Sequence, residues 1–207
     1  MSKLTVKDVK ISEMTKSDYI KPIRVNYVQD GKSKIWDLVE VHHSVAAIIY
    51  NKERKRLICV KQFRPGVYYH STAQNDRTNE IDTSKYPSSL GETVEFCSGI
   101  VDKNKSLKEI AVEEIEEETG YVVSQQNLEE VKTFRSAVGI AGDSTTMYYV
   151  EVTDNQKKSS GGGIDEEIIE VVELTIEEAQ ELLRQPVTTA PAEFLFGLLW
   201  FLQNKKN

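Results

Sequence analysis

The chain has 207 residues, of which 39% are hydrophobic and 29% are charged, and its formal net charge at pH 7 is −7. This length and composition predict one well-packed domain with a smaller appendage, and they exclude an intrinsically disordered chain. The acidic balance argues against nucleic acid as the main partner, because neutralising a phosphate backbone requires clustered Lys and Arg.

Neither end of the chain has the features of a membrane-targeting segment. Residues 1–6 contain no apolar stretch typical of a signal peptide, and the apolar run near the C-terminus is too short to span a bilayer. The sequence therefore predicts a cytoplasmic protein without a membrane partner. Cys59 and Cys97 lie in apolar, strand-like segments, where we expect buried reduced thiols.

Residues 1–41 are predicted to form a β-rich segment appended to the main domain, residues 42–207. Ile23 to Val28 alternates as a strand does, Asp30-Gly31 is typical of a hairpin turn, and Ser33 to Val41 returns as a second strand. An isolated hairpin is at best marginally stable. We therefore expect it to pack against the rest of the chain or against a second copy.

The segments that follow predict an α/β fold with a mixed sheet between helical layers. Strands are expected over residues 43–50, 56–63, 92–97, 131–136, 146–152 and 168–174, and helices over 107–120, from 175 onward and over 191–203. Residues 71–91 are rich in Ser, Thr, Asn, Asp and Pro and lack periodicity. We expect a mobile excursion there, and its sequence does not indicate a role.

The predicted helix that ends at Gly120 carries an unusual acidic run. Its last two turns contain Glu113, Glu114, Glu116, Glu117 and Glu118. Like charges three and four residues apart repel one another, and the C-terminal end of the helix dipole disfavours anions. Such runs are usually solvated faces, and a helical wheel tests that interpretation.

At about 100° per residue, the wheel divides the acids between two faces. The solvent face carries Glu109, Glu113 and Glu116. The core-facing side carries Glu114, Glu117 and Glu118. Ionised carboxylates are costly there unless a cation joins them. Their oxygens at positions i, i+3 and i+4 suit Mg²⁺, with Mn²⁺ as the alternative, and no cluster of His and Cys favours zinc.

The segment from Gly99 to Tyr121 resembles the Nudix box, G-x5-E-x7-R-E-U-x-E-E-x-G-U, in which U is a bulky aliphatic residue. The spacing matches throughout. Lys105 stands where the family has Glu, and Glu113 stands where it has Arg, so both charges are inverted. We hypothesise that the pairing between these two positions is kept as Lys105 with Glu113, which would help to orient Glu114.

The resemblance implies an α/β/α Nudix sandwich and a metal site. Its metal ligands would be Glu114, Glu117, Glu118 and the backbone carbonyl of Ser98. Further segments, Lys61 to Pro65 and Val94 to Gly99, resemble the ADP-ribose pyrophosphatase branch. Over nearly the whole chain the resemblance is to the family of animal pyrophosphatases that act on uridine diphosphate glucose.

That narrower resemblance implies a Mg²⁺-dependent hydrolase of nucleoside diphosphate sugars. It would cleave the diphosphate bridge of UDP-glucose and release UMP and glucose 1-phosphate. It would be a homodimer in which the N-terminal β-structure reaches the partner. By the same analogy Arg64 and Glu95 would contact the substrate, although Arg64 is also typical of a surface strand residue in an ion pair.

By the same resemblance, a carboxylate on the late loop from Gly163 to Glu167 would activate water. Glu166 and Glu167 are the candidates, with Asp165 third, and Glu118 is counted among the catalytic carboxylates. A solvated acidic loop is the competing interpretation. The glycines are expected to make this side of the loop mobile.

Three alternatives stay open on the sequence alone. ADP-ribose or another dinucleotide is one, because no residue here identifies a base. A non-catalytic nucleotide-binding module is another, since the box departs from the family at Lys105 and Glu113. The third is a protein-interaction surface formed by the acidic helix.

Overall fold

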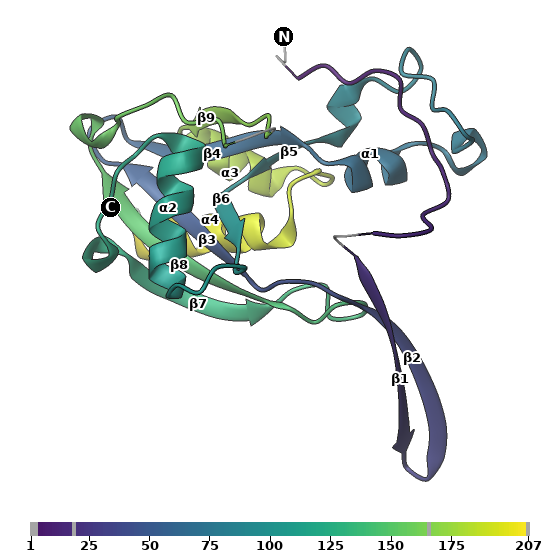
Figure 1. Ribbon diagram of the computed structural model, residues 1–207. Helices are drawn as coiled ribbons and strands as arrows, with labels where there is room; N and C mark the ends of the chain where they lie inside the picture. The colour runs from purple at the N-terminus through teal and green to yellow at the C-terminus, as the bar shows by residue number, and fades with distance from the viewer. Residues whose placement is uncertain (1–3, 18–19, 165–166, 206–207) are drawn as a thin grey trace.

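A mixed sheet of seven strands forms the centre of the computed structural model, which describes residues 4–17, 20–164 and 167–205 (Figure 1). Its strands are β3 (Ser44–Asn51), β4 (Arg56–Phe63), β5 (Glu92–Glu95), β6 (Cys97–Ile100), β7 (Glu129–Arg135), β8 (Ser144–Val152) and β9 (Glu170–Leu174). The order is β5-β4-β3-β8-β7, with β6 paired to β3 and β9 paired to β4. β3 and β8 run parallel and the other pairs are antiparallel.

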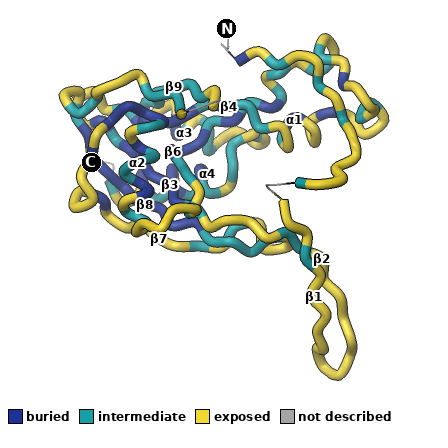
Figure 2. The backbone as a smooth tube through the Cα atoms, viewed as in Figure 1, coloured by how far each residue is buried: buried dark blue, intermediate teal, exposed yellow. Residues whose placement is uncertain are grey.

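Helices cover both faces of this sheet, which confirms the expected α/β/α sandwich. α2 (Leu107–Thr119) packs on one face, and α3 (Ile176–Arg184) and α4 (Ala192–Asn204) pack on the other. Side chains of a strand alternate between the two faces, so Ala47 of β3 joins the α2 side and Ala46 joins the α4 side. Figure 2 shows this central region as the buried part of the chain.

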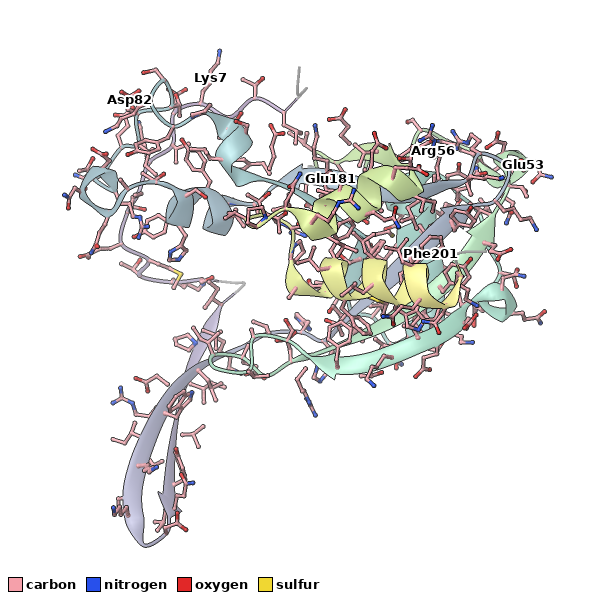
Figure 3. The ribbon with its side chains drawn as sticks, turned by 180° about the vertical axis from the view of Figure 1, so that it is seen from behind. Lys7, Glu53, Arg56, Asp82, Glu181 and Phe201 are labelled. Carbon is pink, nitrogen blue, oxygen red and sulfur yellow. The ribbon has the colours of Figure 1, made fainter. Side chains whose placement is uncertain are left out.

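A capping box begins each of the helices α2 and α3. Ser106 Oγ accepts a hydrogen bond from the Glu109 amide and starts α2, and Thr175 does the same for α3 through Glu178. α2 ends at Gly120 in the left-handed conformation, with φ of 77°. Phe201, labelled in Figure 3, lies on the inner face of α4 against the sheet, 4.9 Å from Tyr50 between ring centroids.

The segment from β5 to β6 changes its partner strand at Phe96. β5 pairs with β4, whereas β6 pairs with β3. β3 and β4 pair with each other only over three residues at their turn end, from Ile49 to Asn51. Beyond this point they diverge, and the β5–β6 segment lies between them, with Glu95 and Ser98 lining a cavity there.

The N-terminal hairpin, β1 (Lys21–Gln29) and β2 (Lys32–Glu40), forms a separate two-stranded sheet that projects from the body (Figure 1). Asp30 and Gly31 form the expected hairpin turn at its tip, and their φ values of 52° and 74° are those that a type I′ turn requires. At its base the Val39 amide donates to the Ile140 carbonyl at 2.8 Å. The predicted boundary between residues 41 and 42 stays a prediction.

Residues 71–91 differ from the expected mobile excursion. They follow a short helix that the sequence did not indicate, α1 (Pro65–Ser71), and the buried Tyr68 donates from its hydroxyl to the Tyr86 carbonyl at 2.6 Å. The N-terminal segment also bonds to them, from Ile11 N to Asn79 O at 2.9 Å. Lys7 and Asp82 mark this corner in Figure 3. Long-range partners of this kind leave no local periodicity in the sequence.

Four short 3-10 helices complete the described elements: Gln74–Asp76, Ser88–Gly91, Gln125–Asn127 and Asp154–Gln156. Cys59 and Cys97 are buried free thiols, as expected. None of the helices in the described part of the chain is long and apolar enough to cross a membrane.

Candidate active site

A cavity of about 370 Å³ opens where β3 and β4 diverge. Side chains from both helical layers reach it, because its walls combine β3 to β6 with α2, α4 and the loop before β9. The charged side chains in its lining, among described residues, are Arg64, Glu95, Glu114, Glu118, Glu167 and Glu193. The cavity therefore gathers most of the carboxylates singled out from the sequence, together with the predicted substrate-binding arginine.

Glu118 is the most buried of the acids on α2, with 4% of its surface exposed. Its Oε2 accepts a hydrogen bond from the backbone N–H of Ser98 at 3.0 Å. Burial raises the pKa of Glu118 to about 8, and the neighbouring carboxylates Glu114 and Glu167 raise it further against the opposing hydrogen bonds. A buried carboxyl with this environment favours either a proton or a bound cation.

Glu114 lies half-buried on the same wall. Gly99 makes room for it, because a Cβ on Gly99 would stand 2.1 Å from the Glu114 carboxyl carbon. Burial raises the pKa of Glu114 to about 7, and repulsion from Glu117 adds to the shift. The absence of a side chain at position 99 therefore lets the Glu114 carboxyl lie directly over β6, where any larger residue would push it aside.

The oxygen atoms of these residues are the kind of ligand that a hard divalent cation binds. Glu114 and Glu118 present carboxylate oxygens to the cavity, and Ser98 lies on the same wall. Glu117 is partly buried but does not line the cavity. Within residues 4–17, 20–164 and 167–205, no three His, Cys, Asp or Glu side chains already converge as a metal site. A cation would therefore need Glu117 to turn toward its neighbours.

The hypothesised contact between the two inverted positions of the box is present. Lys105 Nζ donates a hydrogen bond to Oε1 of Glu113, and Lys103 Nζ lies 3.6 Å from Oε2 of the same carboxylate. Hydrogen bonding to Lys105 lowers the pKa of Glu113. Glu113 is consequently a partly buried, paired acid, whereas the wheel places it on a freely solvated face.

Arg64 and Glu95 face each other across the opposite wall. Arg64 Nε and Nη2 donate to the two Glu95 carboxylate oxygens at 2.8 and 2.6 Å. Burial alone would raise the pKa of Glu95, but the hydrogen bonds from Arg64 and Thr93 hold it below its ordinary value. Glu95 is 7% exposed, so it fixes the guanidinium, which keeps further N–H donors for other groups.

The glycine run before β9 is fastened to the end of α2, which corrects the expectation of a mobile glycine side. The amides of Gly162 and Gly163 donate to the carbonyls of Glu118 and Glu117 at 2.8 and 3.1 Å. These carbonyls lack partners within a helix, so the run acts as a C-terminal cap. A Cβ on Gly161 would lie 2.3 Å from the Glu118 carbonyl oxygen.

Glu167 reaches the cavity from the far end of this loop. Its Oε2 accepts a hydrogen bond from the Ile164 amide at 3.2 Å, and its carboxylate raises the pKa of both Glu114 and Glu118. The other two candidates for the activating group, Asp165 and Glu166, lie outside the described residues.

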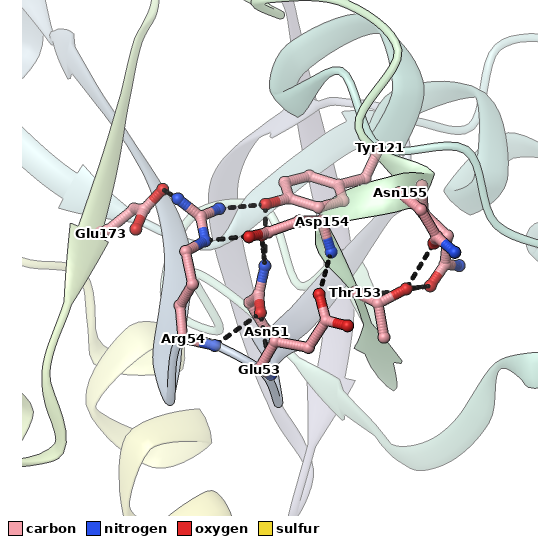
Figure 4. A network of polar contacts seen from close by, with 9 residues as sticks. Asn51, Glu53, Arg54, Tyr121, Thr153, Asp154, Asn155 and Glu173 are labelled. Carbon is pink, nitrogen blue, oxygen red and sulfur yellow. Dashed lines mark hydrogen bonds and ion pairs between the residues drawn. The ribbon is translucent and has the colours of Figure 1, made fainter.

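A polar network behind α2 escaped the sequence reasoning (Figure 4). The fully buried Tyr121 accepts hydrogen bonds from Arg54 and from Asn51 Nδ2, the latter at 3.1 Å. Arg54 also pairs with Asp154 at 2.7 Å and with Glu173 at 2.6 Å. The network joins the β3–β4 turn to the end of α2. One feature of the sequence indicated this network: Tyr121 stands where the box ends in an aliphatic residue, and a buried hydroxyl needs hydrogen-bond partners.

Four polar residues of the cavity lining were also missed, and they are Ser44, Gln62, Thr145 and Glu193. Only Glu193 gave a signal, as the single acid in the apolar helix that follows Pro191. The others are ordinary polar residues that the divergence of β3 and β4 brings together.

Comparison with known proteins identifies relatives over most of the chain. The NUDIX domain model matches residues 40–196. The chain is 36% identical over 209 residues to uridine diphosphate glucose pyrophosphatase of Bos taurus, covering 95% of this chain and 94% of that protein. It is 38% identical over 198 residues to the Mus musculus protein of that name, with 89% of each covered. A GDP-mannose pyrophosphatase of Cronobacter sakazakii is 28% identical over 145 residues, which are 70% of this chain and 66% of that protein.

Proposed function

Since this chain belongs to the NUDIX family, we propose that it is a divalent-cation-dependent hydrolase of nucleoside diphosphate sugars that converts UDP-glucose and water to UMP and glucose 1-phosphate. The observation that carries this proposal is the identity of 36% across 95% of the chain with a relative named for that activity. The buried pair Glu114 and Glu118 on the cavity wall supports the hydrolytic chemistry.

We assign Glu114, Glu117 and Glu118, with the backbone carbonyl of Ser98, to a site for Mg²⁺ or Mn²⁺. When bound, the ion neutralises and polarises the diphosphate. The raised pKa values of Glu114 and Glu118 support this assignment, because a cation relieves the burial and repulsion that cause both shifts. The Ser98 amide would keep Glu118 in its orientation by the 3.0 Å hydrogen bond.

Glu167 is the described candidate for the base, and Glu166 shares this assignment outside the described residues. The base accepts a proton from water as the water oxygen bonds to one phosphorus of the bridge. The bond from that phosphorus to the bridging oxygen breaks, and the oxygen leaves with the other phosphate. Glu118 would contribute to the same step by helping to hold the cation at the cavity wall.

Arg64 is proposed to bind a phosphate oxygen of the substrate. Two of its N–H groups are used by Glu95, and within the described residues the other side-chain N–H groups have no partner and can donate into the cavity. Glu95 would act by orienting Arg64 and by accepting hydrogen bonds from substrate hydroxyls.

We further propose a homodimer in which residues 1–41 pair with a second copy and residues 42–207 form the hydrolase domain. Val28 and Ile35 lie on one face of the hairpin with 70% and 59% of their surfaces exposed. Trp36, on the other face, is 51% exposed although its Nε1 donates to the Gly139 carbonyl. Exposed apolar patches of this kind mark association surfaces. A mass measurement in solution by light scattering would test the dimer.

The proposed activity is tested by incubating the chain with UDP-glucose, GDP-mannose and ADP-ribose, with Mg²⁺ or with a chelator, in water enriched in ¹⁸O. We expect fastest release of products from UDP-glucose, with one ¹⁸O atom in either UMP or glucose 1-phosphate. A preference for ADP-ribose would instead favour an ADP-ribose pyrophosphatase. Binding of all three without release would contradict the enzyme and favour a nucleotide-binding module.

A further inference from the structure

We propose that a second cavity, between the end of β7 and the start of α4, binds the nucleobase of the substrate nucleotide. This inference rests on the proposed function and names the subsite that holds one half of the substrate. The cavity has a volume of about 440 Å³, within the range of small-molecule sites. Phe134, Phe196, Lys132, Arg135 and Glu193 are the lining residues that carry the argument.

The two phenylalanines give this cavity an aromatic wall. Phe134 and Phe196 meet at 5.5 Å between ring centroids and at 66° between ring planes. Both are partly buried against the core on the α4 side of the sheet, so their positions are fixed while part of each ring faces the cavity. Every nucleobase has a flat π-face that stacks on such rings.

Glu193 connects the second cavity to the candidate active site. It lines both cavities, and its charge helps to raise the pKa of Arg64. Within the described residues the Glu193 side chain makes no hydrogen bond and no ion pair. Its place in the first turn of α4 is favourable for an acid. A carboxylate at this junction can accept hydrogen bonds from ribose hydroxyls, as an acidic residue does in dinucleotide-binding folds.

The order of these groups matches the order of groups in a nucleotide sugar. Arg64 and Glu118 lie where the diphosphate is proposed to bind, Glu193 follows, and the aromatic wall lies beyond it. Ribose separates the phosphate from the base in the same way. Lys132 and Arg135 supply N–H donors in the second cavity, and the oxygens of a pyrimidine accept hydrogen bonds.

The sugar half fits the first cavity better than the second. Ser44, Gln62 and Thr145 line the first cavity and offer hydroxyl and amide groups to a polyhydroxylated ring. The second cavity is walled largely by rings and aliphatic carbon, which suit a flat base. Phe196 and Phe134 are therefore assigned to specificity for the nucleoside half.

The test measures the binding of UMP and of glucose 1-phosphate separately by calorimetry, for the wild-type chain, Phe196→Leu and Phe196→Ala. Phe196→Leu keeps the aliphatic packing on the core and removes the aromatic face. We expect the Kd of UMP to rise by about tenfold, the loss of one stacking contact, with the Kd of glucose 1-phosphate unchanged. Leu199→Ala, an exposed position of the same helix, is the matched control and should change neither.

The result that would overturn the proposal is an unchanged Kd for UMP in both Phe196 variants, or a selective loss of glucose 1-phosphate binding. Equal loss of both ligands, with a lowered melting temperature, would also contradict it. Glu193→Gln should weaken UMP but not 2′-deoxy-UMP if the carboxylate holds the ribose 2′-hydroxyl. Since binding is measured without turnover, absence of UDP-glucose cleavage would count against the proposed function and not against this subsite.

Discussion

Lys105 Nζ donates a hydrogen bond to Oε1 of Glu113, so the two inverted charges of the box contact each other. The contact ties the loop before α2 to the exposed side of the helix. Glu114 follows Glu113 in the chain and faces the cavity from the other side. The pairing hypothesised for the two inverted positions is therefore present.

The first prediction concerns this pair. Glu113→Arg alone would set three cations, Lys103, Lys105 and the new guanidinium, side by side, and we expect a severalfold lower kcat with little change in KM. Adding Lys105→Glu restores opposite charges and should recover most of the rate. Steady-state kinetics of the two single variants and the double variant check this as a cycle. A double variant no better than Glu113→Arg would show that the pair does not orient Glu114.

The second prediction concerns the stability of the metal-free protein as the pH changes. The folded pKa values of Glu118 and Glu114, about 8 and about 7, lie above their ordinary value of 4.5. The folded chain therefore keeps protons that the unfolded chain has lost. The stability from these two carboxyls is fully present below about pH 4.5 and is lost as the pH rises through about 7 and 8.

Thermal unfolding in a chelator at several pH values checks this sign. We expect the melting temperature of the wild-type chain to fall from acid to mildly alkaline pH more steeply than that of Glu118→Gln, and saturating Mg²⁺ should remove most of the difference. Parallel curves for the two proteins would contradict the account, because other groups titrate equally in both.

The third prediction concerns the glycine run that caps α2. In Gly161→Ala the new Cβ would meet the Glu118 carbonyl at 2.3 Å, in a backbone with φ of 66° that disfavours alanine. We expect a loss of about 1–3 kcal/mol in unfolding free energy, together with a lower kcat because the loop that carries Glu167 shifts. Gly139→Ala has open space and no such φ, and it should leave both unchanged. Equal unfolding free energies and equal kcat values for the two variants would show that the glycine run does not hold α2 and the loop in place.

The fourth prediction concerns the network behind α2. Tyr121→Phe removes the hydroxyl that accepts from Arg54 and Asn51, so both hydrogen bonds are lost, and one of them comes from the charged guanidinium. The expected cost is about 1–3 kcal/mol of unfolding free energy, measured by denaturant titration. Tyr69→Phe is the control, since that ring is exposed and no hydrogen bond of its hydroxyl is found in the described part of the chain. A cost of the same size in the control would contradict the prediction.

Features set by local pattern could be predicted from the sequence. The hairpin turn at Asp30-Gly31 and the helix end at Gly120 each depend on neighbouring residues, and each lies as expected. The burial of Glu118 also followed from the wheel, because periodicity alone decides which face of a helix meets the sheet.

Features that depend on distant partners could not be predicted. α1 is fixed by the burial of Tyr68 and by its contact with Tyr86, and the glycine run is fixed by the free carbonyls of α2. Glu193 joins the cavity because α4 begins beside the diverging strands. None of these contacts leaves a period in the sequence, so composition suggested mobility where the structure has hydrogen bonds.

The most direct test of the central claim is the rate of UMP and glucose 1-phosphate release from UDP-glucose by Glu118→Gln and Glu116→Gln beside the wild-type chain, with and without Mg²⁺. Both substitutions remove one charge from α2, but Glu116 is exposed and Glu118 is buried on the cavity wall. The account predicts Mg²⁺-dependent cleavage by the wild-type chain and Glu116→Gln, and at least about 100-fold slower cleavage by Glu118→Gln. Wild-type rates in Glu118→Gln, or equal losses in both variants, would contradict it.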